Sequence, residues 1–312
     1  MNAKNPYRGL VGLVLVLVLL PIVLPNSYYF DVAIRVAMNA CVAIGLNLLV
    51  GYTGQISLGH AGFFGIGAYA SAILSSRYGW PPVGALLASA AATGLLALLI
   101  ARPVLKLRGH YLAMATLGLG FLVSIVIVNE SSLTGGPDGM AVDPLRIFGW
   151  EVSGDRAWSA INALLLLVVP WMALNLINSP AGRALRAIHG SEVAAKVLGV
   201  DVTSFKTRVF VLSAVLASFM GSLSAHYVGF VTPGVAGYFH SIELVTMVVV
   251  GGMASIFGSI VGAAILTMLP QLLSTFEGME TIVFGIILMV TMIALPKGLV
   301  PTLRSKFSRG GR

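Results

Sequence analysis

Uncharged residues form long continuous runs along this chain of 312 residues. One membrane-spanning helix needs about 20 mostly apolar residues, because the hydrocarbon core of a bilayer is about 30 Å thick. Most of the runs reach that length, and three are long enough for two segments each. We therefore expect roughly eight to ten membrane segments, some of them short, broken or re-entrant. The runs are Gly9–Phe30, Val36–Ser76, Tyr78–Ala101, Gly109–Asn129, Ala157–Gly182, Val209–Ile242, Leu244–Phe276 and Thr281–Pro296.

The runs predict helices rather than strands. They are continuously apolar and lack the alternation of apolar and polar residues that is typical of membrane β-barrels. Backbone groups within lipid must be paired inside the protein, which permits only helices and closed barrels. We therefore expect an all-α integral membrane protein, a polytopic helical bundle that forms one transmembrane domain over residues 1–312.

The composition agrees with a membrane protein. Hydrophobic residues make up 57% of the chain and charged residues only 10%, whereas a soluble globular domain carries about 25% charged residues. The net charge is +8, but the basic residues are scattered over short loops and do not gather on one face. This distribution disfavours a nucleic-acid partner.

Lys and Arg are divided unequally between the two sides of the membrane. If the N-terminus is cytoplasmic and the chain crosses about ten times, fifteen of the nineteen Lys and Arg lie on the cytoplasmic side. By the positive-inside rule, this asymmetry predicts that both termini are cytoplasmic. No cleavage signal follows the first run, so we interpret that run as an uncleaved span. The four outer residues are Arg35, Arg77, Arg146 and Arg156.

The segment Gly51–Tyr69 (GYTGQISLGHAGFFGIGAY) departs from a plain span. Glycine at this density interrupts a helix or lets helices approach closely. One interpretation is an element that lines a translocation path, since broken helices at membrane depth face protein or water. The other is a close-packed helix interface with interhelical hydrogen bonds. The path candidates in this segment are Gln55, Ser57, His60, Phe63, Phe64 and Tyr69.

The loop from Asn178 to Arg208 is too charged to span a membrane and predicts an amphipathic cytoplasmic helix. Ser179 suits an N-cap and Pro180 the first turn, and Gly199 suits a helix end. The helix is one piece, or a pair broken at Gly190. An apolar stripe at helical spacing is formed by Leu185, Ile188, Ala195 and Leu198. Its alanine-rich face fits a protein groove better than lipid.

Small residues recur every fourth position from Ser213 to Gly229, which favours close helix packing. Tyr227 and Phe230 lie at the expected outer end of this segment and are further path candidates. Glu243 is an acid within an apolar stretch, so it is also a candidate. Because it lies near an expected segment end, a structural role is equally compatible.

The largest expected outer, periplasmic loop covers residues 129–158. Its glycines and Pro137 predict turns. Its acidic residues suit a solvated loop or contact with a soluble partner.

Motifs for catalysis are missing from the sequence. It has no Gly-Lys pair, hence no P-loop, and no His-Glu-x-x-His or Gly-x-Ser-x-Gly. The five histidines lack the spacing of a metal site, so we predict no metal and no catalytic residues. An intramembrane hydrolase that pairs Ser57 with His226 has no local support.

Several separated segments resemble the permease subunits of branched-chain amino acid ABC importers, of the LivM type in the LivH/LivM family. The segments, in the family's order, are GYTGQISLGHAGFFGIGAYASA, RALRAIHGSEVAAKVLGVDVTSFK, SIELVTMVVVGGMASIFGSIVGAAIL and LPKGLV. The resemblance covers about Ile34 to Val300 and implies the ABC importer permease fold.

The resemblance implies a transport subunit in a bacterial inner membrane and four further components. These are a LivH-like second permease, two ATPase subunits like LivG and LivF, and a periplasmic substrate-binding protein. ATP and Mg would be used by the ATPases, and no cofactor by this chain. The loop at 178–208 would be the coupling helix that contacts an ATPase. Its candidate residues are Arg183, Arg186, His189, Glu192, Lys196 and Gly199.

Other functions stay open. Similar permeases move urea, short amides or aromatic acids, and no residue set here selects a branched-chain amino acid over these. A stand-alone secondary transporter would couple transport to an ion through Glu243 or His60.

Overall fold

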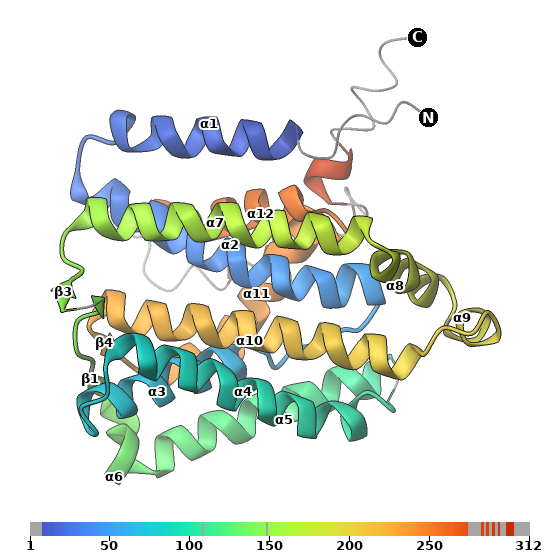
Figure 1. Ribbon diagram of the computed structural model, residues 1–312, viewed down its shortest axis with the longest axis horizontal. Helices are drawn as coiled ribbons and strands as arrows, with labels where there is room; N and C mark the ends of the chain where they lie inside the picture. Colours follow the sequence, from blue (N-terminus) through green and yellow to red (C-terminus); the bar gives the residue numbers. More distant parts are fainter. Residues whose placement is uncertain are drawn as a thin grey trace.

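The computed structural model describes residues 8–107, 109–147, 149–273, 282–283, 285–286, 289–290, 293 and 298–302. Within these residues the protein is a bundle of helices that run along one long axis (Figure 1). The main helices are α1 (Arg8–Val23), α2 (Ser27–Thr53), α3 (His60–Ser76), α4 (Pro82–Val104), α5 (His110–Asn129), α7 (Asp155–Asn178), α10 (Val202–Val228), α11 (Tyr238–Gly251) and α12 (Ile256–Leu273).

Five of these helices, α2, α4, α5, α7 and α10, are long and apolar enough to cross a membrane. Three shorter apolar helices accompany them: α11 and most of α1 and α12. The predicted all-α polytopic bundle with broken helices is confirmed. The segment Thr281–Pro296 lies largely outside the described residues.

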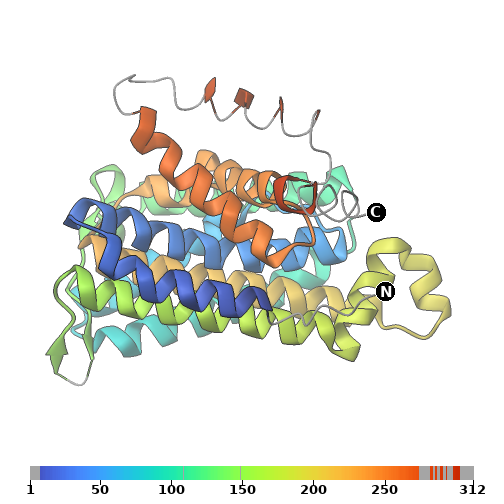
Figure 2. The ribbon, with the colours of Figure 1, turned by 90° about the horizontal axis from the view of Figure 1, so that it is seen from above.

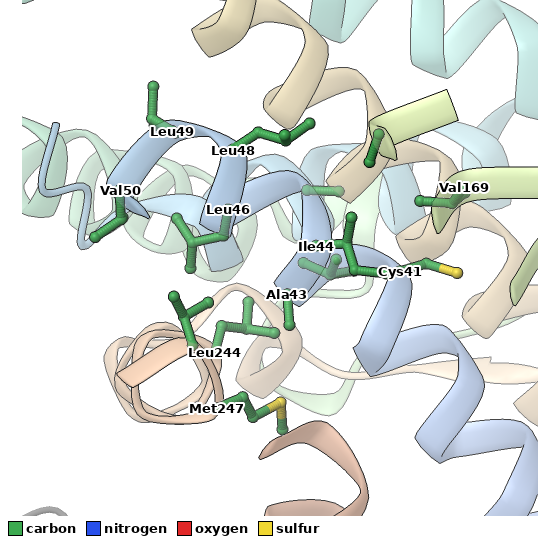
Figure 3. Close-up of a cluster of buried hydrophobic side chains, with 14 of the residues drawn as sticks. Cys41, Ala43, Ile44, Leu46, Leu48, Leu49, Val50, Val169, Leu244 and Met247 are labelled. Carbon is green, nitrogen blue, oxygen red and sulfur yellow. The ribbon is translucent and has the colours of Figure 1, made fainter. Parts of the chain in front are cut away.

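The centre of the bundle is formed by α2 and α10. Their most apolar windows are 78% and 67% buried, against 28–33% for α4, α5 and α7. Helix α10 packs on α3 and α4, while α2 packs on α7, α12 and α10 (Figures 1 and 2). The buried side chains Cys41, Ile44 and Leu48 of α2 therefore face neighbours on several sides. On another side of α2, Ala43 and Leu46 lie towards Leu244 and Met247 of α11 (Figure 3).

Short elements close one end of the bundle, which we call the strand end. Strand β1 (Met140–Ala141) pairs antiparallel with β4 (Phe230–Val231), and β2 (Arg146–Ile147) pairs with β3 (Trp150–Glu151). Also in this part of the chain are α6 (Ser131–Thr134), η1 (Gly136–Asp138) and η2 (Pro233–Ala236). The predicted outer loop at 129–158 thus contains turns and three of the four strands. The β1–β4 pair joins it to the segment after α10.

Helices α8 (Pro180–Gly190) and α9 (Glu192–Val197) project from the opposite end, which we call the coupling end (Figure 1). They occupy the predicted amphipathic loop. Of the two forms expected, the helix pair is correct, and its break falls at Gly190–Ser191. Ser179 caps α8 by accepting a hydrogen bond from the Gly182 backbone N–H, and Pro180 is its first residue.

One boundary inferred from the uncharged runs is wrong. Asp31 and Arg35, which separate two runs, lie inside α2, because that helix already begins at Ser27 after Pro25 and Asn26. Glu243, which was expected near a segment end, lies in the second turn of α11. Helix α2 carries two charged residues among apolar ones, so charge alone did not mark where it begins.

Candidate functional site

The segment Gly51–Tyr69 contains a break between two helices. Helix α2 ends at Thr53, and Gly54 adopts a left-handed φ of 71° that turns the chain. Residues 54–59 form no helix or strand, and α3 begins at His60. Along this connection Gln55 and Ser57 are buried whereas Ile56 is 41% exposed. The alternation is that of an extended segment with one face against protein.

His60 fastens this connection to α10. Its Nδ1 lies 2.8 Å from Ser57 Oγ and its Nε2 lies 2.7 Å from Ser213 Oγ. The ring is 1% exposed and stands edge-on to Phe63 and Phe210, with centroids 5.8 and 6.4 Å away. Both ring nitrogens are therefore used inside the protein. These contacts support the interpretation of an interhelical hydrogen-bond former.

Gln55 is buried, with 2% exposure, but unlike Ser57 and His60 it forms no side-chain hydrogen bond among the described residues. Neither its side-chain oxygen nor its side-chain nitrogen has a hydrogen-bond partner among the described residues. A buried polar group without a partner costs stability, so such groups are rare in folded proteins. Gln55 is thus the polar group of this segment that remains available for a ligand or a water molecule.

Glycines let α3 lie against α10 and η2. A Cβ on Gly67 would meet the backbone of Ser218, and a Cβ on Gly65 would meet Ala236. Hydroxyl groups hold the contact between these helices, since Ser222 Oγ donates to the Gly67 carbonyl oxygen at 2.8 Å. The predicted close packing of small residues is therefore present at this interface.

The two remaining tyrosine candidates lie towards the strand end. Tyr69 is buried, and its hydroxyl donates to the Val231 carbonyl oxygen at 3.5 Å. Tyr227 donates to Asp31 Oδ1 at 2.8 Å, and Asp31 Oδ2 accepts from Arg35 Nε at 2.8 Å. This chain of contacts ties α10 to the first turns of α2.

A cavity of about 210 Å³ lies beside this network. Arg35 of α2, Phe64 of α3 and Phe230 of β4 line it, together with small and hydroxyl residues of α10 and the β4–η2 connection. Phe64 and Phe230 are path candidates that the fold brings together. Arg35 was not among those candidates. The i,i+4 spacing of Asp31 and Arg35 could have revealed it, because such a pair indicates a helix.

Glu243 belongs to a different place in the bundle. His240 Nδ1 lies 3.3 Å from its Oε2, and the Glu243 side chain is 36% exposed. The His240 ring stands edge-on to Phe64 at 5.1 Å. Glu243 therefore reaches the cavity only indirectly, through His240 and Phe64.

The serine and histidine considered for hydrolysis do not meet. Ser57 pairs with His60, whereas His226 Nε2 lies 2.9 Å from Ser71 Oγ and its Nδ1 lies 2.7 Å from the Asp143 carbonyl oxygen. Within the described ranges there is no group of three His, Cys, Asp or Glu that could hold a metal ion.

Five of the six predicted coupling residues lie in α8 and α9, and Gly199 lies just beyond α9. Arg183, His189 and Lys196 are exposed, and a Cβ on Gly54 would contact the His189 ring. Arg186 donates from Nη1 to the Ile177 carbonyl oxygen at 2.8 Å, and Lys206 forms an ion pair with Glu192. Gly199 follows α9 with a left-handed φ of 82°.

The predicted apolar stripe is correct in three of its four members. Leu185, Ile188 and Ala195 are buried, but Leu198 is 78% exposed. Leu198 lies beyond the last residue of α9, so the helical spacing no longer sets its direction. With Val193 and Val197, which are 65% and 83% exposed, it forms an outward apolar surface on α9.

Comparison with known proteins supports a transport role. The family model described as "Branched-chain amino acid transport system / permease component" matches residues 28–296. The LivM permeases of Salmonella typhimurium and Escherichia coli, described as high-affinity branched-chain amino acid transport proteins, are 34% identical over 303 residues. That match covers 88% of this chain and 70% of theirs.

More distant relatives are also permeases. The Escherichia coli LivH permease is 26% identical, covering 84% of this chain and 90% of its own. The ribose import permease RbsC of Escherichia coli is 26% identical, covering 92% of both chains. No solved structure gives a significant match.

Proposed function

The chain belongs to the family of branched-chain amino acid permease components, and we propose that it carries branched-chain or other hydrophobic amino acids inward across a bacterial inner membrane. It is a multi-pass permease of the ATP-binding-cassette importer class. The observation that carries the proposed substrate is the 34% identity to LivM permeases over 88% of the chain. The alternatives within the same class are urea, short amides and aromatic acids.

We propose that the chain works with four partners. A second, LivH-like permease would complete the path, two ATPase subunits would bind and hydrolyse ATP with Mg, and a periplasmic binding protein would deliver the substrate. The ATPases would dock on α8 and α9, where Val193, Val197 and Leu198 present an apolar surface. Arg183 of α8 and Lys196 of α9 are also exposed. This surface fits a protein groove, because exposed apolar patches mark interaction sites.

The proposed path uses residues of the two interrupted regions. Gln55, Ser57, His60, Phe63 and Phe64 belong to the first region, and Tyr227, Phe230 and Glu243 to the second, with Tyr69 between them. Gln55 and the cavity beside Phe64 and Phe230 are the parts best able to meet a substrate. His60 and Phe63 would act by holding the connection in place.

Reconstitution of the complete complex in proteoliposomes tests this function. We expect ATP-dependent import of leucine, isoleucine and valine that requires the binding protein. Import of urea, short amides or aromatic acids in preference to these would reassign the substrate. Uptake by this chain alone, driven by a proton or sodium gradient, would instead favour a secondary transporter that couples to an ion through Glu243 or His60.

A further inference from the structure

Arg35 is a cation placed within a membrane-spanning helix. It lies in the third turn of α2, next to Ile34, which is 1% exposed. Charged residues inside membrane segments are costly and mark functional sites by default. The Arg35 side chain is nevertheless 45% exposed. Much of its guanidinium group is therefore accessible and not covered by neighbouring side chains.

The one acid that pairs with Arg35 leaves much of the guanidinium group free. Asp31 Oδ2 accepts from Nε, while Asp31 Oδ1 accepts from the Tyr227 hydroxyl. Within the described part of the chain, Nε is the guanidinium nitrogen that makes this pair. The two Nη groups have no hydrogen bond there. Arginine presents its nitrogens in a planar fork that matches a carboxylate.

The cavity beside Arg35 has the form of a small-molecule site. Phe64 and Phe230 supply aromatic walls, and Val228 and Val235 add aliphatic surface. Thr232 and Ser224 contribute the hydroxyl groups. The volume of about 210 Å³ is below the roughly 300–1,000 Å³ of drug-sized pockets. One cation beside aromatic and aliphatic walls suits a small anion with an apolar side chain, and the two hydroxyl groups can bond its polar end.

We propose that this cavity binds the transported amino acid, with its carboxylate on the Nη groups of Arg35 and its apolar side chain between Phe64 and Phe230. The inference rests on the proposed function and adds a substrate class, the α-monocarboxylates. Urea and neutral amides lack the anion that the arginine would bind. The site therefore makes this permease selective in addition to any selectivity of the binding protein.

A purely structural role is the competing explanation for Arg35. In that case Arg35 only stabilises α2 through its ion pair with Asp31 and binds no substrate. The Asp31→Asn variant separates the two roles, because it removes the carboxylate partner and keeps the guanidinium group. If Arg35 binds the substrate carboxylate, Asp31→Asn preserves import and Arg35→Gln strongly reduces it. If Arg35 is structural, both variants have the same effect.

The test uses the complete complex in proteoliposomes with L-leucine, leucinamide and 3-methylbutylamine as probes. We expect Arg35→Gln to reduce leucine import by about tenfold or more, the loss of a charge-assisted hydrogen bond. ATP hydrolysis stimulated by loaded binding protein should persist. Arg146→Gln is the matched control, since Arg146 pairs with Glu151 in the β2–β3 hairpin with both side chains at least half exposed. It should import leucine at the wild-type rate.

Other outcomes would overturn the inference. Equal leucine import by wild type and Arg35→Gln would remove the proposed site, as would equal losses in Arg35→Gln and Asp31→Asn. If the wild-type complex imports leucinamide as fast as leucine, then the permease does not recognise the substrate carboxylate. If the wild-type complex imports no amino acid at all, the proposed function itself fails, and this result is distinct from a failure of the Arg35 site.

Discussion

A single buried histidine holds the first interrupted region together. His60 bridges Ser57 in the connection and Ser213 in α10 through its two ring nitrogens. Its removal would leave both hydroxyl groups without their partner inside the bundle, and a buried unpaired polar group costs about 1–3 kcal/mol. His60 thus fixes both the conformation of the connection at residues 54–59 and the packing of α3 on α10.

The His60→Ala variant should therefore lower the stability of the permease. We expect the free energy of unfolding to fall by about 2–4 kcal/mol, measured as a lower midpoint of thermal unfolding in detergent. His110→Ala is the control, because His110 is exposed at the start of α5. An unchanged unfolding midpoint with loss of transport would contradict a structural role. It would indicate instead that His60 lines the translocation path.

At this scale the sequence predicted which residues are polar and unusual but not their partners. Gln55 and His60 can be recognised from the sequence alone, because they are polar residues in an apolar segment. The bond from His60 to Ser213 joins residues 153 positions apart. Ser213 begins the row of small residues that predicted close helix packing, but that pattern does not say which side chain Ser213 would bond. Arg35 was missed because it was assigned to a loop rather than to a helix.

At the scale of elements, the contact between α3 and α10 depends on glycine. The Gly67→Val variant would push a side chain into the Ser218 backbone. Backbone cannot move aside as a side chain can, so overpacking should cost about 1–3 kcal/mol or more. The expected result is a low yield of folded permease, measured by monodisperse elution in detergent.

The matched control for this prediction is Gly118→Val in α5. A Cβ on Gly118 meets nothing within 4 Å, and its φ is ordinary for a helix. This variant should elute like wild type. If both variants elute normally, the packing of α3 on α10 tolerates a gap and the glycine argument is wrong.

Helix α9 makes a second prediction at this scale. The Val197→Asp variant places a charge on the apolar surface without touching the buried face, since Val197 is 83% exposed. We expect weaker co-purification of the ATPase subunits with an unchanged unfolding midpoint. Leu107→Asp, at an exposed position just beyond α4, is the control and should retain the ATPases.

Charge reversal at Glu192 or Arg186 would be a less specific test of the same docking. Glu192 pairs with Lys206, and Arg186 binds the Ile177 carbonyl oxygen. Both changes would disturb α8 and α9 themselves, and a loss of ATPase binding would then have two causes. Normal ATPase binding by Val197→Asp would exclude α9 from the interface.

At the scale of the whole molecule, the positive-inside rule gives an orientation that labelling can test. The native Cys41 is buried, so Cys41→Ala provides a background for new cysteines. We expect Val197→Cys to react with a membrane-impermeant thiol reagent only from the cytoplasmic side, and Trp150→Cys only from the outside. Labelling of both positions from one side would contradict the predicted topology.

The sequence predicted the class of fold well because hydrophobic length is a strong signal. It predicted the limits of single helices less well. Asp31 and Arg35 separate two uncharged runs, whereas α2 begins at Ser27 and contains both residues. The end of α10 was expected near Tyr227 and Phe230, and the structure has its break there, built from β4 and η2. The cavity needs residues from α2, α3, α10 and β4, and sequence spacing cannot bring these together.

The dependence of α3 on α10 has a consequence for biosynthesis. Ribosomes add about 5–20 residues per second, and Ser213 is made 153 residues after His60. The polar face of α3 is therefore completed about 8–30 s before its hydrogen-bond partners leave the ribosome. During that interval α3 has buried serines and a histidine but no α10 to bond them. A chain arrested before Ser213 would therefore keep His60 without its α10 partner.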